Sequence, residues 1–162
     1  MIDICFSIGS NISDRSAHLD RAVELMRDRI GNMVKRSSLY ETSSWGFDSE
    51  HFLNGVVLMR TDLSPLDCFE EAQRIEQEMG RGRKGEGYVD RVIDLDILSY
   101  GNRSFDTKLL TIPHPRLAER RFVLEPWAEI CSEMIVAGTG MTVEMLKNAC
   151  KDKGGCVKLE YV

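Results

Sequence analysis

The chain has 162 residues, of which 43% are hydrophobic, and its formal net charge is −5. This length and apolar content predict a single domain, residues 1–162, while the negative charge argues against a general nucleic-acid binder, which is usually basic. No apolar run has the length of a membrane helix, the N-terminus lacks the regions of a secretory signal, and the five cysteines form no Cys-x-x-Cys pair, so we expect a cytoplasmic protein with reduced thiols.

The first half of the sequence predicts strands and helices in alternation. The expected elements are a strand over 2–7, a turn over 9–11, a helix from Ser13 or Asp14 to Gly31, a strand over 34–42, a loop over 43–50 and a strand over 52–60. Ser64 and Pro65 then begin a second helix, because serine is a favoured N-cap and proline fits the first helical position. Its expected buried residues are Leu66, Phe69, Ala72, Ile75 and Met79, and Gly80 ends it.

The second half predicts a fourth strand followed by an elaborated C-terminal part. The expected elements are a strand over 88–98, a turn at 101–102, a polar segment to residue 116, a helix-forming stretch over 117–130 interrupted at Pro126, a helix over 142–151 and a strand over 157–161. The core order is therefore β-α-β-β-α-β. This order predicts an α+β fold of ferredoxin type, with helices on one face of a mainly antiparallel sheet.

Two carboxylates mark the fourth predicted strand. Side chains alternate across a strand, so Ile93, Leu95 and Ile97 share one face while Asp94 and Asp96 share the other. Unpaired burial of two neighbouring carboxylates is costly, and a bound cation removes that cost. Mg²⁺ commonly takes one or two carboxylates and completes its shell with water and phosphate. We interpret the pair as a metal site; a solvated polar strand face is the alternative.

A basic, glycine-rich segment, 80–87, lies just before this strand. It matches the Gly-x-Gly-x-x-Gly spacing of dinucleotide sites, but it follows a predicted helix, whereas that motif follows a strand. The functional interpretation is a loop that brings Arg81, Arg83 and Lys84 to phosphate oxygens, which arginine can bind through two parallel hydrogen bonds. A solvated basic linker is the alternative.

Three further side chains stand out. His114 lies between two prolines on a stiff, extended backbone from which it could donate to phosphate, although loop histidines are more often simple surface residues. Trp45, in a glycine-containing loop, could line a flat ligand. Asn54 interrupts an apolar strand, and a buried amide there requires hydrogen-bond partners from the backbone or from the edge of a heterocycle.

In order along the chain, these residues resemble the 6-hydroxymethyl-7,8-dihydropterin pyrophosphokinase family of folate biosynthesis. The resemblance extends from about residue 8 to residue 129. Its motifs are Ile8-Gly9-Ser10-Asn11 with Asp14-Arg15, Tyr40-Glu41-Thr42 before Trp45-Gly46, Phe52-Leu53-Asn54, Arg74-Ile75-Glu76 leading to Gly80-Arg81, Arg91-Val92-Ile93-Asp94-Leu95-Asp96, and Pro113-His114-Pro115-Arg116 leading to Arg120. The resemblance implies the ferredoxin-like fold and transfer of pyrophosphate from ATP to the hydroxymethyl oxygen of the pterin, with release of AMP.

The resemblance also implies roles for individual residues. Asp94 and Asp96 would hold two Mg²⁺ ions on the ATP phosphates. The catalytic residues would be Arg81, Arg91, Asp96 and His114. The residues contacting ATP would be Glu76, Arg83, Lys84, Ile97, Thr111 and Arg120. The residues contacting the pterin would be Thr42, Trp45, Phe52, Asn54 and Phe122, with the two phenylalanines on either side of the ring. The expected partners are these two small molecules, without nucleic acid or membrane. The sequence does not define an oligomeric state, and we expect a monomer.

The chain departs from the family pattern before the metal strand and in the pterin loop. Val89-Asp90 stands where glycine or alanine and then proline usually precede the arginine, Tyr88 stands where some members have tryptophan, and Ser43-Ser44 replaces a proline-containing stretch. Two other functions remain open at this level. One is a ferredoxin-like RNA-binding module, which the acidic pair opposes. The other is a catalytically silent nucleotide sensor, which turnover would exclude.

Overall fold

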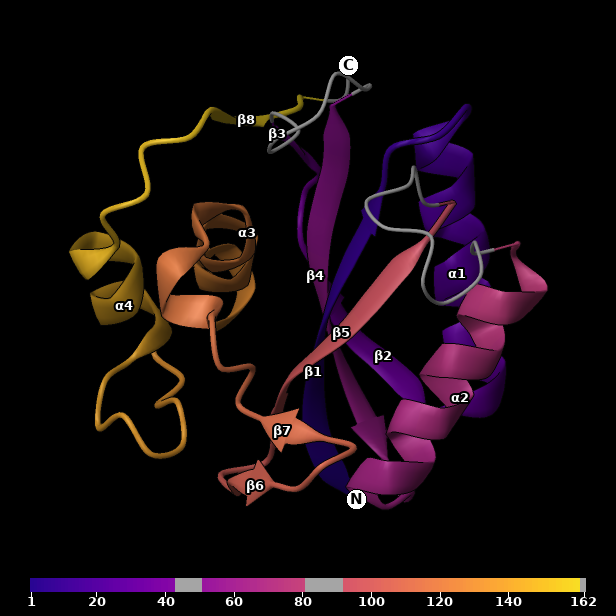
Figure 1. Cartoon of the computed structure of the whole chain (residues 1–162), viewed down its shortest axis with the longest axis horizontal. Helices are drawn as coiled ribbons and strands as arrows, with labels where there is room; N and C mark the ends of the chain where they lie inside the picture. Colours follow the sequence, from indigo (N-terminus) through magenta and orange to yellow (C-terminus); the bar gives the residue numbers. More distant parts are fainter. Residues whose placement is uncertain (43–50, 81–91, 161–162) are drawn as a thin grey trace.

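The computed structural model describes residues 1–42, 51–80 and 92–160, in which an antiparallel sheet separates two layers of helices (Figure 1). The strands are β1 (Ile2–Ser10), β2 (Asn32–Arg36), β3 (Tyr40–Thr42), β4 (Phe52–Thr61), β5 (Asp94–Tyr100), β6 (Phe105–Asp106), β7 (Thr111–Ile112) and β8 (Cys156–Lys158). The helices are α1 (Arg15–Arg29), α2 (Pro65–Glu78), α3 (Arg121–Cys131) and α4 (Val143–Ala149), with a short 3-10 helix at Leu117–Glu119. Within these ranges, no helix combines the length and apolarity that crossing a membrane requires.

The sheet has the strand order β5-β1-β4-β3-β8, and β2 also pairs with β4. The pairings of β1 with β4 and β5, and of β4 with β2 and β3, are antiparallel. Since α1 follows β1 and α2 follows β4, the core has the predicted β-α-β-β-α-β order. The predicted ferredoxin-like α+β fold is confirmed, and β6 and β7 add a small hairpin that the sequence did not predict.

The two core helices begin where their capping residues predict. The Asp14 side chain accepts a hydrogen bond from Ala17 N (3.2 Å), and Ser64 Oγ accepts one from Asp67 N (3.1 Å). Each bond satisfies one of the amides that a helix start leaves without an intrahelical partner. The expected burial of Leu66 is wrong. Its side chain is 44% exposed, because it lies in the first turn of α2 on the outer side of the helix.

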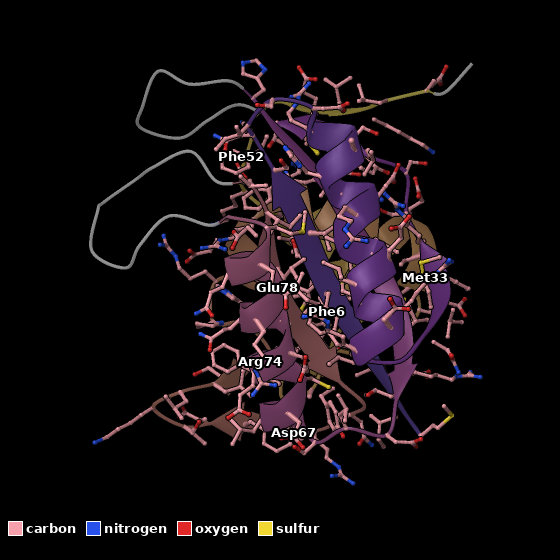
Figure 2. The ribbon with its side chains drawn as sticks, turned by 90° about the vertical axis from the view of Figure 1, so that its right-hand side faces the viewer. Phe6, Met33, Phe52, Asp67, Arg74 and Glu78 are labelled. Atoms are coloured by element: carbon pink, nitrogen blue, oxygen red, sulfur yellow. The ribbon has the colours of Figure 1, made fainter. Side chains whose placement is uncertain are left out.

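Helices cover both faces of the sheet, not one. Phe6 and Ile97 belong to the core beneath α1 and α2, and Figure 2 looks onto this face, with Phe6 between the helices and the sheet. On the opposite face, Val56 and Leu98 pack with Trp127 of α3. The prediction of helices on one face is correct for α1 and α2, but the C-terminal part forms a second layer. The apolar run from Val56 to Met59 in β4 fits this burial, since a strand covered on both faces can be apolar on both.

Several predicted boundaries differ from the structure. Gly9 belongs to β1 and does not form a turn, because its strand continues to pair with β4. The strand expected over 34–42 is broken, since the Ser37 hydroxyl accepts the hydrogen bond of Val56 N (2.9 Å) in place of a main-chain carbonyl. Pro126 lies within α3 and does not interrupt it, because the packing of the apolar helix face outweighs one missing amide. The last helix ends at Ala149, and the last strand covers Cys156–Lys158.

Glu129 of α3 ties the helix to the β3–β8 end of the sheet. Its carboxylate accepts hydrogen bonds from Ser38 N and from the Tyr40 hydroxyl (3.0 Å), and it pairs with Lys158 Nζ (3.1 Å). Burial alone would raise the pKa of the Glu129 carboxyl, but the bonds from Ser38, Lys158 and Tyr40 together lower that pKa. The carboxylate is therefore more stable in the folded protein than in the unfolded chain.

We expect Glu129→Ala to lower the free energy of unfolding at pH 7 by about 1–3 kcal/mol, since the buried Tyr40 hydroxyl loses its acceptor. A depressed carboxyl pKa contributes stability above the unfolded value of 4.5 and loses that contribution as pH falls through the folded value. The difference between the two proteins should therefore shrink below pH 4.5 in urea titrations. Glu133→Ala, at an exposed position, is the control; an equal loss in both variants would contradict the proposed role.

Candidate active site

The register of the three central strands forms a row of residues across one sheet face. Asp94 of β5 lies opposite Gly9 of β1, and Gly9 lies opposite Asn54 of β4. Directly opposed residues in antiparallel strands point to the same face. Because neighbouring strands lie about 4.8 Å apart, the Asp94 and Asn54 backbones are separated by about 10 Å across the glycine. The row therefore places a carboxylate and an amide on the same face, the one that α3 covers, with one strand between them.

Asp94 and Asp96 share this face, as the sequence predicts. Both are partly buried, whereas Leu95 and Ile97 are buried in the core on the other side. Among residues 1–42, 51–80 and 92–160, no group of three or more His, Cys, Asp or Glu side chains is arranged to hold a metal ion. Two carboxylates leave further coordination positions of a cation for water and substrate phosphate. This donor set fits Mg²⁺, which retains water and binds phosphate.

Four of the predicted pterin-contacting residues gather at one end of this face. Asn54 Nδ2 donates a hydrogen bond to Thr42 Oγ1 (2.8 Å), and both side chains are buried. Phe52 lies opposite Thr42 in the β3–β4 pairing, at the end of the molecule away from Asp67 (Figure 2). Thr42 and Phe122 line the same small pocket. The set thus offers two aromatic rings and an oriented amide on one surface.

Gly9 creates the space that Asn54 occupies. A Cβ atom at residue 9 would lie 2.7 Å from Asn54 Oδ1, which is closer than real contacts allow. The sequence predicts a turn at Gly9, and that prediction does not include this role. The available signal was a glycine following an apolar strand, which often marks a close approach by another group.

His114 and Arg120, predicted to contact phosphate, lie between β7 and α3. Burial is the largest effect lowering the pKa of His114, and the Arg120 and Arg116 charges add to it, while Asp94 opposes them. His114 Nδ1 accepts a hydrogen bond from Arg116 N (3.2 Å), so the neutral ring carries its proton on Nε2. The Arg120 guanidinium lies 5.8 Å from the centre of the Phe122 ring. The segment thus presents donors near both Asp94 and Phe122.

The lowered pKa of His114 gives a testable pH dependence. Because the folded protein disfavours the charged imidazole, we expect His114 in the metal-free protein to titrate below its ordinary value of 6.5. The unfolded chain then binds more protons between the two values, so this residue's stability contribution is complete above pH 6.5 and declines as pH falls. NMR titration of the ring measures the midpoint directly. A midpoint above 6.5 would contradict the geometry described for this ring.

The predicted ATP contacts Glu76, Ile97 and Thr111 gather around β5. Glu76 is buried, and its Oε1 accepts a hydrogen bond from Leu95 N (3.1 Å), which ties α2 to the outer edge of the sheet. Main-chain groups two residues apart point to the same side of a strand, so the Ile97 amide also faces this edge while its side chain lies in the core. Any ligand contact of Ile97 would therefore use its main chain. Thr111 lies in β7, which packs against β5.

Other predicted residues lie outside the described ranges. These are Trp45, Arg81, Arg83, Lys84 and Arg91, together with the departures from the family pattern at Ser43-Ser44, Tyr88 and Val89-Asp90. Their predicted roles remain predictions.

The sequence profile described as 7,8-dihydro-6-hydroxymethylpterin-pyrophosphokinase (HPPK) matches residues 5–132 of this chain. A 2-amino-4-hydroxy-6-hydroxymethyldihydropteridine pyrophosphokinase of Porphyromonas gingivalis is 40% identical over 134 residues, covering 80% of this chain and 91% of the relative. The protein of the same name from Bacillus subtilis is 42% identical over 130 residues, covering 79% and 77% of the two chains.

Solved structures give the same fold. A chain described as HPPK-DHPS in complex with substrates superposes with a TM-score of 0.75 at 16% identity, covering 91% of this chain and 43% of that one. Wild-type HPPK-DHPS of Plasmodium falciparum gives a TM-score of 0.73 at 16% identity, with 92% and 43% covered. This chain therefore corresponds to less than half the length of those longer proteins.

Proposed function

The chain belongs to the 7,8-dihydro-6-hydroxymethylpterin-pyrophosphokinase family, and on that basis we propose that it transfers the pyrophosphoryl group of ATP to the hydroxymethyl oxygen of 6-hydroxymethyl-7,8-dihydropterin and releases AMP. In this proposal residues 1–162 act as one pyrophosphokinase domain and as a monomer. The observation that carries the proposal is the cross-strand row of Asp94, Gly9 and Asn54. It supports a metal-binding carboxylate and a ring-binding amide about 10 Å apart, the separation of two strand spacings.

The amide and the aromatic residues would bind the pterin. Asn54, held by Thr42, would hydrogen-bond the polar edge of the ring, and Phe52 and Phe122 would cover its faces. A buried amide oriented in advance favours a ring with complementary donors and acceptors, since an unmatched ring leaves polar groups without partners. The hydroxymethyl group would then point along the row toward Asp94.

The triphosphate would lie over the aspartates. Asp94 and Asp96 would hold Mg²⁺, for which the sequence resemblance implies two ions. When bound, the metal neutralises charge on the phosphates and orients them. The His114 Nε2–H and the Arg120 guanidinium would donate to phosphate oxygens from the α3 side. Arg81, Arg83, Lys84 and Arg91 are proposed to add charge from outside the described ranges, and Glu76, Ile97 and Thr111 to contact the nucleotide along the β5 edge.

Pyrophosphoryl transfer requires chiefly alignment and charge neutralisation. The pterin oxygen forms a bond to the β-phosphorus of ATP while the bond from that phosphorus to the oxygen of AMP breaks, and the hydroxyl proton is lost. Protein groups contribute by fixing the two reactants in line and by stabilising charge on the transferred group. The proposed site provides both, with a rigid sheet beneath the pterin and cationic donors around the phosphates.

The test combines the protein, Mg²⁺, ATP and 6-hydroxymethyl-7,8-dihydropterin and follows nucleotides and pterins by chromatography. We expect AMP to form in step with pyrophosphorylated pterin, and neither product without the pterin. Release of ADP in place of AMP, or turnover that does not depend on the pterin, would contradict the proposal. Light-scattering measurements on the same sample test the monomer.

A further inference from the structure

The C-terminal segment, residues 150–158, is fastened to the start of α3 by a reciprocal pair of residues. The Asp152 Oδ2 atom accepts a hydrogen bond from Arg121 N (3.2 Å), the first residue of α3. In return, the Arg121 guanidinium donates to the carbonyl oxygens of Asp152 (2.7 Å) and Cys150 (3.1 Å). Asp152 Oδ1 also accepts from Gly154 N (2.8 Å). Side chain and main chain of both partners are thus engaged.

Asp152 acts as the N-terminal cap that α3 lacks in its own sequence. The residue before the helix is Arg120, whose side chain makes no capping bond. A carboxylate at this end satisfies an amide without an intrahelical partner and is favoured by the helix dipole. The cap is therefore supplied by a residue 31 positions later in the chain. Phe122 directly follows the capped residue in the first turn of α3.

The same segment forms one wall of the pocket beside the proposed pterin site. This pocket is lined by Thr42, Arg121, Phe122, Asp152, Gly154, Gly155 and Cys156. Beyond it, Cys156 pairs with Thr42 in the β3–β8 ladder. Figure 1 shows the segment leaving α4, passing α3 and reaching β8 beside β3. The segment therefore contacts both Thr42 and the beginning of α3, the two sides between which a pterin would lie.

We propose that Asp152 and Arg121 are positioning residues for the pterin: by holding residues 150–158 against α3, they fix Phe122 and Thr42 at the spacing that the ring requires. The inference rests on the proposed function, and Asp152 with the rest of segment 150–158 lies outside residues 5–132, which match the family, whereas Arg121 lies within them. Removing the pair should weaken pterin binding specifically, because Thr42 and Phe122 border the pocket while the β5 edge proposed for ATP is on another part of the sheet.

The experiment compares Asp152→Ala, Arg121→Ala and the double variant of the full chain. We expect each single change to raise the KM for the pterin about tenfold, with kcat and the KM for ATP within about twofold of wild type. The double variant should raise the KM for the pterin no more than the more impaired single variant does, because both residues hold the same segment, 150–158, against α3. Asp152→Asn keeps one of the two carboxylate acceptors and should be intermediate. Arg21→Ala, at an exposed ion pair of α1, is the control.

A purely structural role gives a different result. It would lower the amount of active enzyme, and so the apparent kcat, without changing the KM for the pterin; that outcome, or additive effects in the double variant, would overturn the inference. If an alanine variant does not fold, Arg121→Lys and Asp152→Asn provide the same comparison, since lysine cannot reproduce the planar fork. Equilibrium dialysis with the pterin, without ATP, separates the two proposals. If the wild type shows no turnover but binds the pterin, and the Asp152 and Arg121 variants bind it more weakly, only the proposed transfer is contradicted.

Discussion

Asp96→Asn should reduce pterin-dependent AMP formation by about 10²–10³-fold, and Asp94→Asn should have an effect of the same order. Asparagine has nearly the same shape as aspartate but no charge, so it binds Mg²⁺ less strongly. The charge of the phosphates is then less well neutralised. The two carboxylates lie on one face of β5, about 6–7 Å apart at their Cα atoms. Each substitution also removes repulsion between the two like charges.

The measurement pairs activity with a metal titration that does not depend on turnover. Mg²⁺ should raise the unfolding temperature of the wild type and do so less in either variant, because a ligand stabilises the folded protein only as far as it binds. Asp3→Asn is the matched control, since Asp3 lies at the opposite end of β1 in a surface pair with Arg60. Wild-type rates in either aspartate variant, or an equal response to Mg²⁺, would refute the metal assignment.

Much of the fold could be predicted because its signals are local. Ser64 followed by Pro65 marks a helix start through capping chemistry that operates within one turn, and α2 begins there. The alternation of Asp94 and Leu95 likewise needs only the geometry of one strand. The second helical layer could not be predicted in this way. Pro126 reads as a helix breaker locally, and only the packing of α3 on β4 explains why the helix continues.

In the candidate site, too, the residues with a local sequence signal could be predicted and those defined by long-range contacts could not. Asn54 and His114 were recognisable from the sequence, because an amide in an apolar strand and a histidine between prolines are unusual in themselves. Arg121 and Asp152 were not, since their contact joins residues 31 positions apart and no local pattern relates them. Gly9 was seen but misplaced in a turn. Its importance follows from the register of β1 against β4, which local sequence does not define.

Gly9→Ala should raise the KM for the pterin by about ten- to a hundredfold. The new methyl group would lie 2.7 Å from Asn54 Oδ1, so the amide must move and its bond to Thr42 must lengthen or break. Displacing a buried, oriented polar group costs about 1–3 kcal/mol, and each 1.4 kcal/mol corresponds to a factor of ten in affinity. The backbone is not the cause, because Gly9 lies within a paired strand that alanine also adopts.

A double-mutant cycle decides whether Gly9 acts through Asn54. In Asn54→Ala the crowded oxygen is gone, and the next atom near the added methyl group is the Leu53 carbonyl at 3.8 Å, an ordinary contact. Gly9→Ala should then have almost no further effect on the KM for the pterin, whereas independent residues would give additive changes. Additive effects would mean that Gly9 serves the pterin or the phosphates directly. A cycle that closes as expected would show that the absence of a side chain at Gly9 orients the Asn54 amide for the pterin.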